Sequence, residues 1–206
     1  MNVIKLTYPP FDNVCSYFVY WDGDAAILID CVPGSYEKAT RLAKDLGKTI
    51  QMVLLTHGHI DHIHDINKFE NDRIKIALHS NDAEKLLTDK HLGKRFGMSI
   101  EPTTADVVLD RSYLIIDDHR INIIKTPGHT AGSVCFEIQG VLFTGDTLFR
   151  GTIGRTDFED GNYEDMMKSL KLLRSSYPPK TLVYPGHGLE TTLENERINN
   201  PYFKRI

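Results

Sequence analysis

The segment Thr56–His62 (Thr-His-Gly-His-Ile-Asp-His) constrains this chain more than any other, because it holds four metal-competent side chains within six positions. A short apolar run, Met-Val-Leu-Leu, precedes it directly and is typical of a strand covered on both faces. His57 and His59 are two residues apart, so their side chains can converge on one ion where the chain leaves the strand. Asp61 and His62 are adjacent and diverge, which suits a second ion beside the first.

Three further candidates each stand at a turn behind an apolar strand, with a glycine directly before them: His129, Asp146 and His187. Glycine lets the backbone turn sharply, and loops at strand ends are where a rigid scaffold presents catalytic groups. Together with the first segment they make five histidines and two aspartates, with no thiolate. Imidazole and carboxylate ligands favour Zn(II), Fe(II) or Mn(II).

This donor set suits two divalent ions with coordination left for water. The expected ligands of one ion are His57, His59 and His129, those of the other are Asp61, His62 and His187, and Asp146 would bridge the two. Two ions about 3.5–4 Å apart can share a hydroxide, because the pKa of bound water falls to about 7. The other histidines lack the context of strand, turn and glycine and are interpreted as structural: His64, His79, His91 and His119.

Short segments rich in β-branched and aromatic residues predict a protein of sheets covered by helices. The expected strands are Val14–Tyr20, Ala25–Asp30, Met52–Leu55, Ile74–Leu78, Ile121–Lys125, Val134–Ile138, Val141–Thr144 and Thr181–Tyr184. Expected helices are one carrying the stripe Ala39, Leu42, Ala43 and Leu46, one carrying Met166, Leu170 and Leu173, and the segments Asp82–Thr88 and Glu190–Asn199. Neither a repeat nor a linker divides the chain, so we expect one domain over residues 1–206.

Composition narrows the class of protein. The 206 residues are 41% hydrophobic and 25% charged, which provides for a buried core and argues against disorder. A net charge of −4 with scattered Lys and Arg argues against nucleic acid or an anionic membrane as partner. We expect no membrane span, because no apolar run approaches roughly 20 residues, and no signal peptide. Three separated cysteines, Cys15, Cys31 and Cys135, favour a cytoplasmic protein without disulfides.

The motifs resemble those of the metallo-β-lactamase superfamily, in the same order and over nearly the whole chain. They are His57-x-His59-x-Asp61-His62, Gly128-His129-Thr130, Gly145-Asp146-Thr147 and Gly186-His187. The resemblance implies an α/β (α+β) protein with an αβ/βα four-layer sandwich and a dinuclear metal site at one edge of two facing sheets. It also implies that Asp30 supports the metal-site loop without binding an ion.

Within the superfamily, Gly145–Phe158 and the ending Glu196–Tyr202 resemble the short bacterial glyoxalase II-like hydrolases of the hydroxyacylglutathione hydrolase type. This implies hydrolysis of a small thioester, S-D-lactoylglutathione to glutathione and D-lactate, by a metal-bridging hydroxide, with Zn(II) as the expected ion. Asp61 and Asp146 would be the catalytic residues. No dedicated general acid is needed, because a thiol of pKa near 8.5 can leave as the thiolate. The helical domain that supplies part of the glutathione site in long glyoxalase II enzymes is not expected here, because only 19 residues follow His187.

Arg155 is the candidate for contact with a glutathione carboxylate, because a guanidinium fork matches a carboxylate. Related hydrolases carry a cationic residue in the corresponding loop, and Arg150 is a second candidate. An alternative interpretation of Arg155 is a surface ion pair with Asp157.

Other functions stay open at this point. Persulfide dioxygenases share the fold and a Gly-Arg-Thr-Asp-Phe string, and they hold one Fe(II) with two histidines and one aspartate. Here those ligands would be His57, His129 and Asp146. A metal-stabilised binding module is disfavoured, because structural zinc sites close four ligands around the ion, often with cysteines. True β-lactamases and nuclease members are disfavoured by the expected lack of a signal peptide and of an added domain. The sequence leaves metal identity, acyl group and oligomeric state open.

Overall fold

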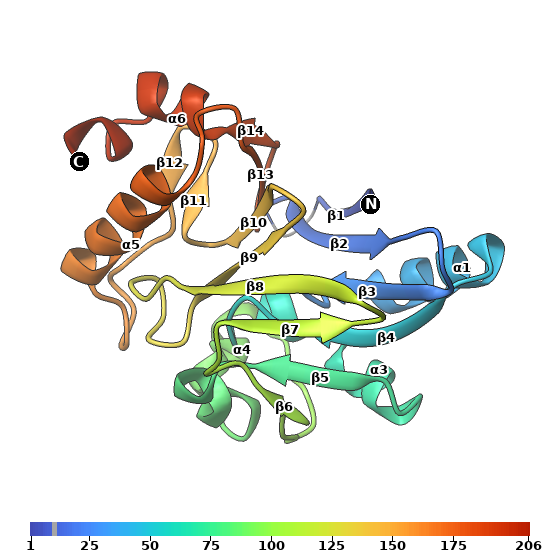
Figure 1. Cartoon of the computed structure of the whole chain (residues 1–206). Helices are drawn as coiled ribbons and strands as arrows, with labels where there is room; N and C mark the ends of the chain where they lie inside the picture. The colour runs from blue at the N-terminus through green and yellow to red at the C-terminus, as the bar shows by residue number, and fades with distance from the viewer. Residues whose placement is uncertain (10–11) are drawn as a thin grey trace.

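Two β-sheets face each other in the centre of the molecule, and helices cover their outer faces (Figure 1). The computed structural model describes residues 1–9 and 12–206. Over these ranges the first sheet has six strands in the order β1-β2-β3-β4-β5-β6. They are β1 (Asn2–Tyr8), β2 (Val14–Tyr20), β3 (Ala25–Ile29), β4 (Thr49–Leu54), β5 (Lys75–Leu78) and β6 (Val107–Val108).

The second sheet, again within the described residues, has six strands in the order β14-β13-β10-β9-β8-β7. They are β7 (Tyr113–Ile116), β8 (His119–Lys125), β9 (Val134–Ile138), β10 (Val141–Gly145), β13 (Leu182–Pro185) and β14 (Thr191–Thr192). A separate two-stranded hairpin follows β10 in the chain and consists of β11 (Leu148–Phe149) and β12 (Thr152–Ile153).

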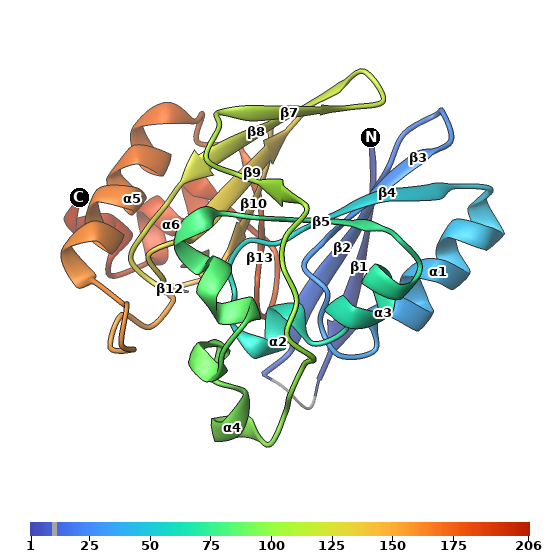
Figure 2. The same cartoon turned by 90° about the horizontal axis from the view of Figure 1, so that it is seen from below.

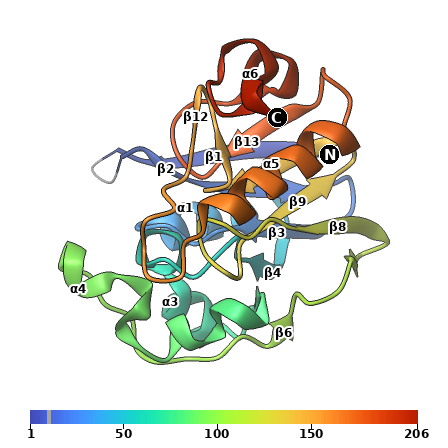
Figure 3. The same cartoon turned by 90° about the vertical axis from the view of Figure 1, so that its left-hand side faces the viewer.

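The helices form the two outer layers. The α-helices are α1 (Ser35–Leu46), α2 (Ile60–Ile63), α3 (Ile66–Asn71), α4 (Gly93–Phe96), α5 (Tyr163–Ser176) and α6 (Leu193–Asn199), and the 3₁₀ helices are η1 (Ser80–Leu86), η2 (Asp89–His91) and η3 (Phe203–Arg205). Figure 2 shows α1 and α3 outside the first sheet, and α5 and α6 outside the second. Figure 3 shows α5 running across the outer face of the second sheet.

Three apolar cores hold these four layers together. Successive side chains on a strand point to opposite faces, so Phe18 of β2 packs outward with Phe69 of α3. Its neighbour Tyr17 points between the sheets and packs against Phe143 of β10. Leu170 of α5 lies in the third core, on the outer face of the second sheet. Each sheet is therefore buried on both faces, which explains the wholly apolar strand segments in the sequence.

The directions of the strands bring distant loops to one edge. β10 pairs parallel with β13, and β9 pairs antiparallel with both β8 and β10. β8, β10 and β13 therefore run in the same direction, and the turns after them lie at the same edge of the second sheet. In the first sheet, β3, β4 and β5 are likewise mutually parallel.

The expected strands and helices are present, and several of them differ in extent or type. The expected helix at Asp82–Thr88 is the 3₁₀ helix η1, which lies earlier in the chain. The expected helix at Glu190–Asn199 begins later, because Thr192 caps α6 by accepting a hydrogen bond from the Asn195 backbone N–H at 3.2 Å. Several short elements were not expected, namely β6, β11, β12, β14, α2, α3, α4, η2 and η3. The longer edge strands β1 and β7 were not expected either. Their positions are set by pairing with β2 and β8.

None of the helices in the described part of the chain combines the length and the apolar composition that a bilayer crossing needs.

Candidate metal centre

The seven expected ligands converge at the edge of the sandwich where the parallel strands end. β4 leads into the turn that carries His57 and His59, and α2 then presents Asp61 and His62. From the opposite sheet, the turns after β8, β10 and β13 bring in the remaining three, His129, Asp146 and His187. Among the described residues, three overlapping groups have their ligand atoms within 4.8 Å of one another. They are His57, His59 and His129; His57, His62 and Asp146; and Asp61, His62 and His187.

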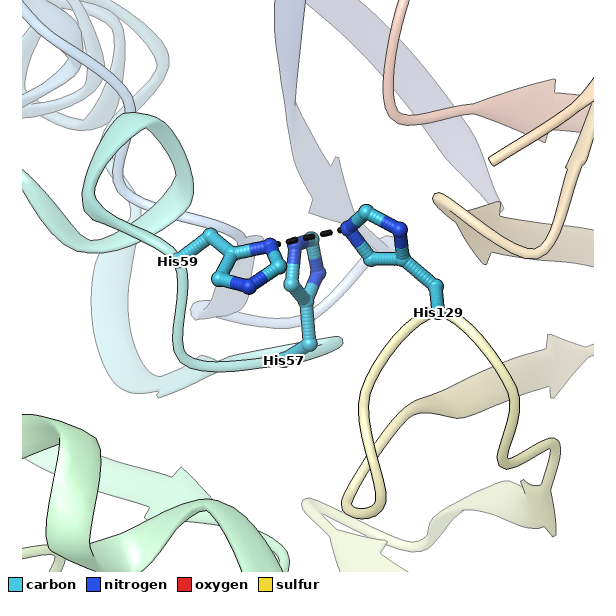
Figure 4. Close-up of side chains that lie close together, drawn as sticks. All are labelled: His57, His59 and His129. Atoms are coloured by element: carbon cyan, nitrogen blue, oxygen red, sulfur yellow. Dashed lines mark hydrogen bonds between the residues drawn. The ribbon is translucent and has the colours of Figure 1, made fainter. Parts of the chain in front are cut away.

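The first group (His57, His59 and His129) consists of three buried imidazoles. Figure 4 shows the three side chains pointing toward one another, and the His59 Nδ1 atom lies 2.8 Å from the His129 Nε2 atom. The Nε2 atom of His57 is buried without a hydrogen-bond partner. An unpaired buried nitrogen is costly, so this cradle fits an ion that would accept its lone pair.

The second group (Asp61, His62 and His187) adjoins the first, and Asp146 lies between the two. The Nε2 atoms of His62 and His187 are 3.3 Å apart, and that of His187 lies 3.2 Å from Asp61 Oδ2. Asp146 Oδ2 lies 3.4 Å from His129 Nε2 and 3.6 Å from His187 Nε2, so one oxygen faces both groups. The donor set and its spacing are compatible with a binuclear metal site.

Asp30 orients two of these histidines from behind. Its Oδ2 atom accepts the His62 Nδ1 proton at 2.8 Å and the Thr56 hydroxyl at 2.9 Å, while Oδ1 accepts the Thr56 backbone N–H at 2.8 Å. Because that hydroxyl donates to Asp30, its oxygen is free to accept from His57 Nδ1, 3.1 Å away. In the neutral form of each imidazole the proton is therefore on Nδ1, and Nε2 is the nitrogen that faces the other ligands.

Backbone carbonyls fix the tautomers of two more ligands. His129 Nδ1 donates to the carbonyl oxygen of Arg155 at 2.8 Å, and His187 Nδ1 donates to that of Asp12 at 3.1 Å. A carbonyl oxygen can only accept, so each Nδ1 carries the proton. Nε2 is again left for an ion.

The two groups differ in their electrostatics. Burial lowers the pKa of His57 well below its ordinary value and lowers that of His59 to about 3, so both are neutral at neutral pH. Burial also disfavours the charged forms of His62 and His187, but the surrounding carboxylates, Asp146 foremost and then Asp61, together outweigh it and raise the pKa of both. A cation entering the second group would therefore displace protons.

At two of the positions before a ligand, neighbouring atoms leave no room for a side chain larger than that of glycine. Gly145 has a left-handed φ of 47°, and a Cβ there would lie 2.5 Å from Thr56 Oγ1. A Cβ on Gly186 would lie 2.3 Å from Asp146 Oδ1 and 2.8 Å from a ring carbon of His62. Both distances are far below a van der Waals contact, so the sequence pattern of glycine before ligand reflects close packing of the turns.

A cavity of about 530 Å³ opens over both groups. Its floor includes ligands from each group, and its walls are formed by loops from both sheets. Phe158 packs against His59 and His129 with ring centroids 5.2 and 5.8 Å away, and Phe149 packs against His187 at 5.7 Å. The remaining lining residues are Asp12, Asn13, Leu92, Phe96, Arg150, Thr152, Ile153, Arg155, Gly188 and Leu189.

Both candidate substrate-binding arginines line this cavity. Arg155 also makes the expected surface pair with Asp157, through two hydrogen bonds of 2.7 and 2.8 Å, and its guanidinium lies 4.7 Å from the centre of the Phe158 ring.

His64 and Asp65 do not line the cavity. Asp65 is buried and instead accepts the Tyr36 backbone N–H at 3.0 Å.

The other histidines interpreted as structural lie outside the three ligand groups. His119 stacks on Trp21 with ring centroids 4.3 Å apart. His79 and His91 are buried and accept backbone N–H groups of Asn81 and Gly93.

Sequence reasoning missed three residues that shape the centre: Phe149, Phe158 and Asp82. The two phenylalanines stand in the loop string that suggested the glyoxalase II-like proteins, but nothing in their spacing indicates a cavity wall. Asp82 carried a usable signal, because it follows the apolar strand β5 as the ligands follow theirs.

Comparison with known proteins agrees with this fold and donor set. A family model of the metallo-beta-lactamase superfamily matches residues 10–187, so the chain belongs to this superfamily. Hydroxyacylglutathione hydrolase GloC of Haemophilus influenzae is 30% identical, over 98% of this chain and 98% of that protein. The sequence-based predictions of the family and of the four-layer sandwich are confirmed.

Two solved structures resemble this one closely. The BLEG-1 B3 metallo-beta-lactamase superposes with a TM-score of 0.89 at 30% identity, covering 98% of this chain and 99% of that one. TTHA1623, solved in a di-iron-bound form, superposes with a TM-score of 0.84 at 31% identity, covering 97% and 100% of the two chains. These relatives are consistent with a metal-dependent hydrolase.

Proposed function

We propose that this protein hydrolyses a small glutathione-based thioester, S-D-lactoylglutathione being the leading candidate, with two divalent ions bound by the seven ligands. One observation carries the proposal: two adjacent donor groups share Asp146 and form the floor of an open cavity. The likeness to GloC supports the choice of substrate class. We propose zinc as the ion, and the di-iron form of TTHA1623 makes iron the competing choice.

Two divalent ions in these groups would supply a water of lowered pKa and positive charge for the carbonyl oxygen of the substrate. The chain supplies the orientation. Asp30 and the two backbone carbonyls hold the imidazoles of His57, His62, His129 and His187 with Nε2 toward the cavity floor. Preorganised ligands of this kind cost no reorganisation during the reaction.

Asp61 is proposed to orient the attacking water and to accept its proton. It lines the cavity, and its Oδ2 atom lies 3.2 Å from His187 Nε2. Burial alone would raise the pKa of Asp61, but His62 and His187 hold it below its ordinary value, so the carboxylate is ionised. No group has to protonate the leaving thiolate, because the pKa of a thiol is near 8.5.

The cavity walls suit a substrate that has both an apolar and an anionic part. Phe149 and Phe158 flank the ligand groups, and Arg150 and Arg155 line the same cavity. We propose that Arg155 binds a carboxylate of the thiol half. Its pair with Asp157 is exposed to solvent and therefore weak enough to exchange.

The first test measures hydrolysis of S-D-lactoylglutathione by the metal-loaded protein through loss of the thioester absorbance. We expect turnover that a chelator abolishes and Zn(II) restores, with two equivalents of metal by elemental analysis. His59→Ala should lose activity and metal together. His64→Ala is the matched control and should keep both, because His64 lies outside the ligand groups. Full activity of His59→Ala with intact metal would refute the assignment.

Two other substrates decide between this proposal and its alternatives. A chromogenic cephalosporin tests β-lactamase activity, which the likeness to BLEG-1 favours as a second candidate. Glutathione persulfide in an oxygen electrode tests the dioxygenase, which would use His57, His129 and Asp146 with one Fe(II). Turnover of either substrate in place of the thioester, by protein that holds metal, would overturn the proposed reaction.

A further inference from the structure

Asp82 contacts the turns of the first group and is not among the residues that line the cavity. It belongs to η1, the 3₁₀ helix that follows β5, and it is completely buried. A buried carboxylate is costly unless several donors satisfy it. Asp82 has four such donors: Gly58, Thr130, Gly132 and Lys85.

Three of the four donors come from the two turns that carry the first group. Asp82 Oδ2 accepts the Gly58 N–H at 2.7 Å, and Gly58 stands between His57 and His59. The same oxygen accepts the Thr130 hydroxyl at 2.9 Å, and Thr130 follows the third histidine of the group directly. One oxygen atom therefore connects the turn after β4 with the turn after β8.

The second oxygen extends this connection. Asp82 Oδ1 accepts the Gly132 N–H at 2.9 Å and lies 3.1 Å from Lys85 Nζ. The ammonium of Lys85 also lies 2.6 Å from Asp160 Oδ2, two residues after the cavity wall Phe158. The network thus joins both ligand turns to the loop that forms one wall of the cavity.

Close packing leaves this network little freedom. A Cβ on Gly132 would lie 2.5 Å from Asp82 Oδ1, and a Cβ on Gly58 would lie 2.9 Å from the Lys85 side chain. Larger residues at these two positions would force the turns away from the carboxylate. The two glycines and the aspartate therefore form one packed unit.

We propose that Asp82 is a positioning residue for the first ion, holding the two turns together so that His57, His59 and His129 face a common point. The inference rests on the two-ion site of the proposed function. The four donors to Asp82 include no imidazole, so it acts through the turns that carry the first group, whereas Asp30 also accepts directly from the His62 ring. Loss of the Asp82 charge should therefore weaken binding of the first ion and leave binding of the second ion much less affected.

The test compares Asp82→Asn with Glu196→Gln in the full-length, metal-loaded protein. Glu196 is also completely buried and accepts four hydrogen bonds, from Gly151, Thr191, Asn195 and Asn200, but it contacts none of the ligand turns. Zn(II) affinity is measured by competition with a chromophoric chelator, and the Co(II)-substituted proteins give the absorption of each site. Thermal unfolding shows how far each variant is destabilised.

We expect the affinity of Asp82→Asn for one of the two ions to be about 10–100-fold lower than that of the wild type, as is typical when a residue that supports a metal ligand is replaced. Its Co(II) spectrum should change as that of His59→Ala does, and unlike that of His187→Ala. Glu196→Gln should bind both ions with wild-type affinity. If Asp82→Asn does not fold, Thr130→Val removes one of the four donors and should weaken the same ion by about threefold or more.

Wild-type affinity and an unchanged Co(II) spectrum in Asp82→Asn, or in Thr130→Val if that variant is needed, would overturn the inference. Equal loss of metal in Glu196→Gln would also overturn it, because general destabilisation would then suffice. Wild-type protein that binds two ions but cleaves no thioester would refute the proposed reaction and leave the Asp82 result valid. Wild-type protein that binds no ion would refute both.

Discussion

Replacing Asp30 with asparagine separates the charge of this residue from its backbone role. Asp30 has a left-handed φ of 58°, and asparagine tolerates this conformation better than most residues. The Thr56 N–H requires an oxygen opposite it, so the new side-chain carbonyl takes the place of Oδ1. The amide NH₂ then replaces Oδ2 and faces His62 Nδ1. His62 has to accept there, which moves its proton to Nε2, the atom that would bind the ion.

The structure allows the size of this effect to be estimated. Residues that orient metal-bound histidines typically contribute 10–100-fold in metal affinity, which is about 1.4–2.8 kcal/mol. Asp30 supports His62 directly and His57 through the Thr56 hydroxyl, so we expect a loss toward the upper end of this range.

Metal affinity of Asp30→Asn is measured by chelator competition, with the bound metal counted by elemental analysis. Asp65→Asn is a closely matched control. Asp65 is also buried, accepts the Tyr36 backbone N–H and lies 3.0 Å from His64 Nδ1, but His64 is outside the ligand groups. Wild-type affinity in Asp30→Asn, or an equal loss in Asp65→Asn, would refute the tautomer argument.

Two further predictions follow from the cavity and the core. Arg155→Ala should raise the KM for S-D-lactoylglutathione by up to about fivefold, because a solvent-exposed ion pair contributes little binding free energy. The kcat, and the KM for an uncharged thioester, should stay unchanged. Asp157→Asn should lower the same KM, and unaltered KM values in both variants would reject the contact. The three cysteines should react with a thiol reagent only in denaturant, because all are buried and burial raises the pKa of Cys135 to about 11. Rapid labelling of folded protein would contradict this.

The residues that converge at the candidate metal centre could be selected from sequence because their signal is local. A glycine before the ligand and an apolar strand before the glycine both indicate one local structure, a buried strand that ends in a tight turn. Gly145 and Gly186 illustrate the physical basis, since a Cβ on either would collide with neighbouring turns. The alternation that buries Phe18 on one face and Tyr17 on the other is also local, so the strands between helices were predictable.

Contacts between distant turns could not be predicted in this way. Asp82 meets Gly58 and Gly132 across separations of 24 and 50 residues, and nothing in the periodicity of η1 indicates these partners. The carbonyl oxygen of Arg155 presents the same difficulty, because its partner His129 is 26 residues away, whereas the pair of its guanidinium with Asp157 is local and could be anticipated. Strand β1 has few fully buried side chains, so its apolar pattern is weak.

In the proposed enzyme, the use of main-chain carbonyls to support His129 and His187 would separate metal binding from substrate choice. The carbonyls belong to Arg155 and Asp12, two positions that also line the cavity. Every amino acid has a carbonyl oxygen, so either side chain can be exchanged while the imidazole keeps its support. Substitutions at these positions would change which substrates bind and leave the support of the imidazoles in place. The rim of this cavity is therefore a region where new specificities could evolve readily.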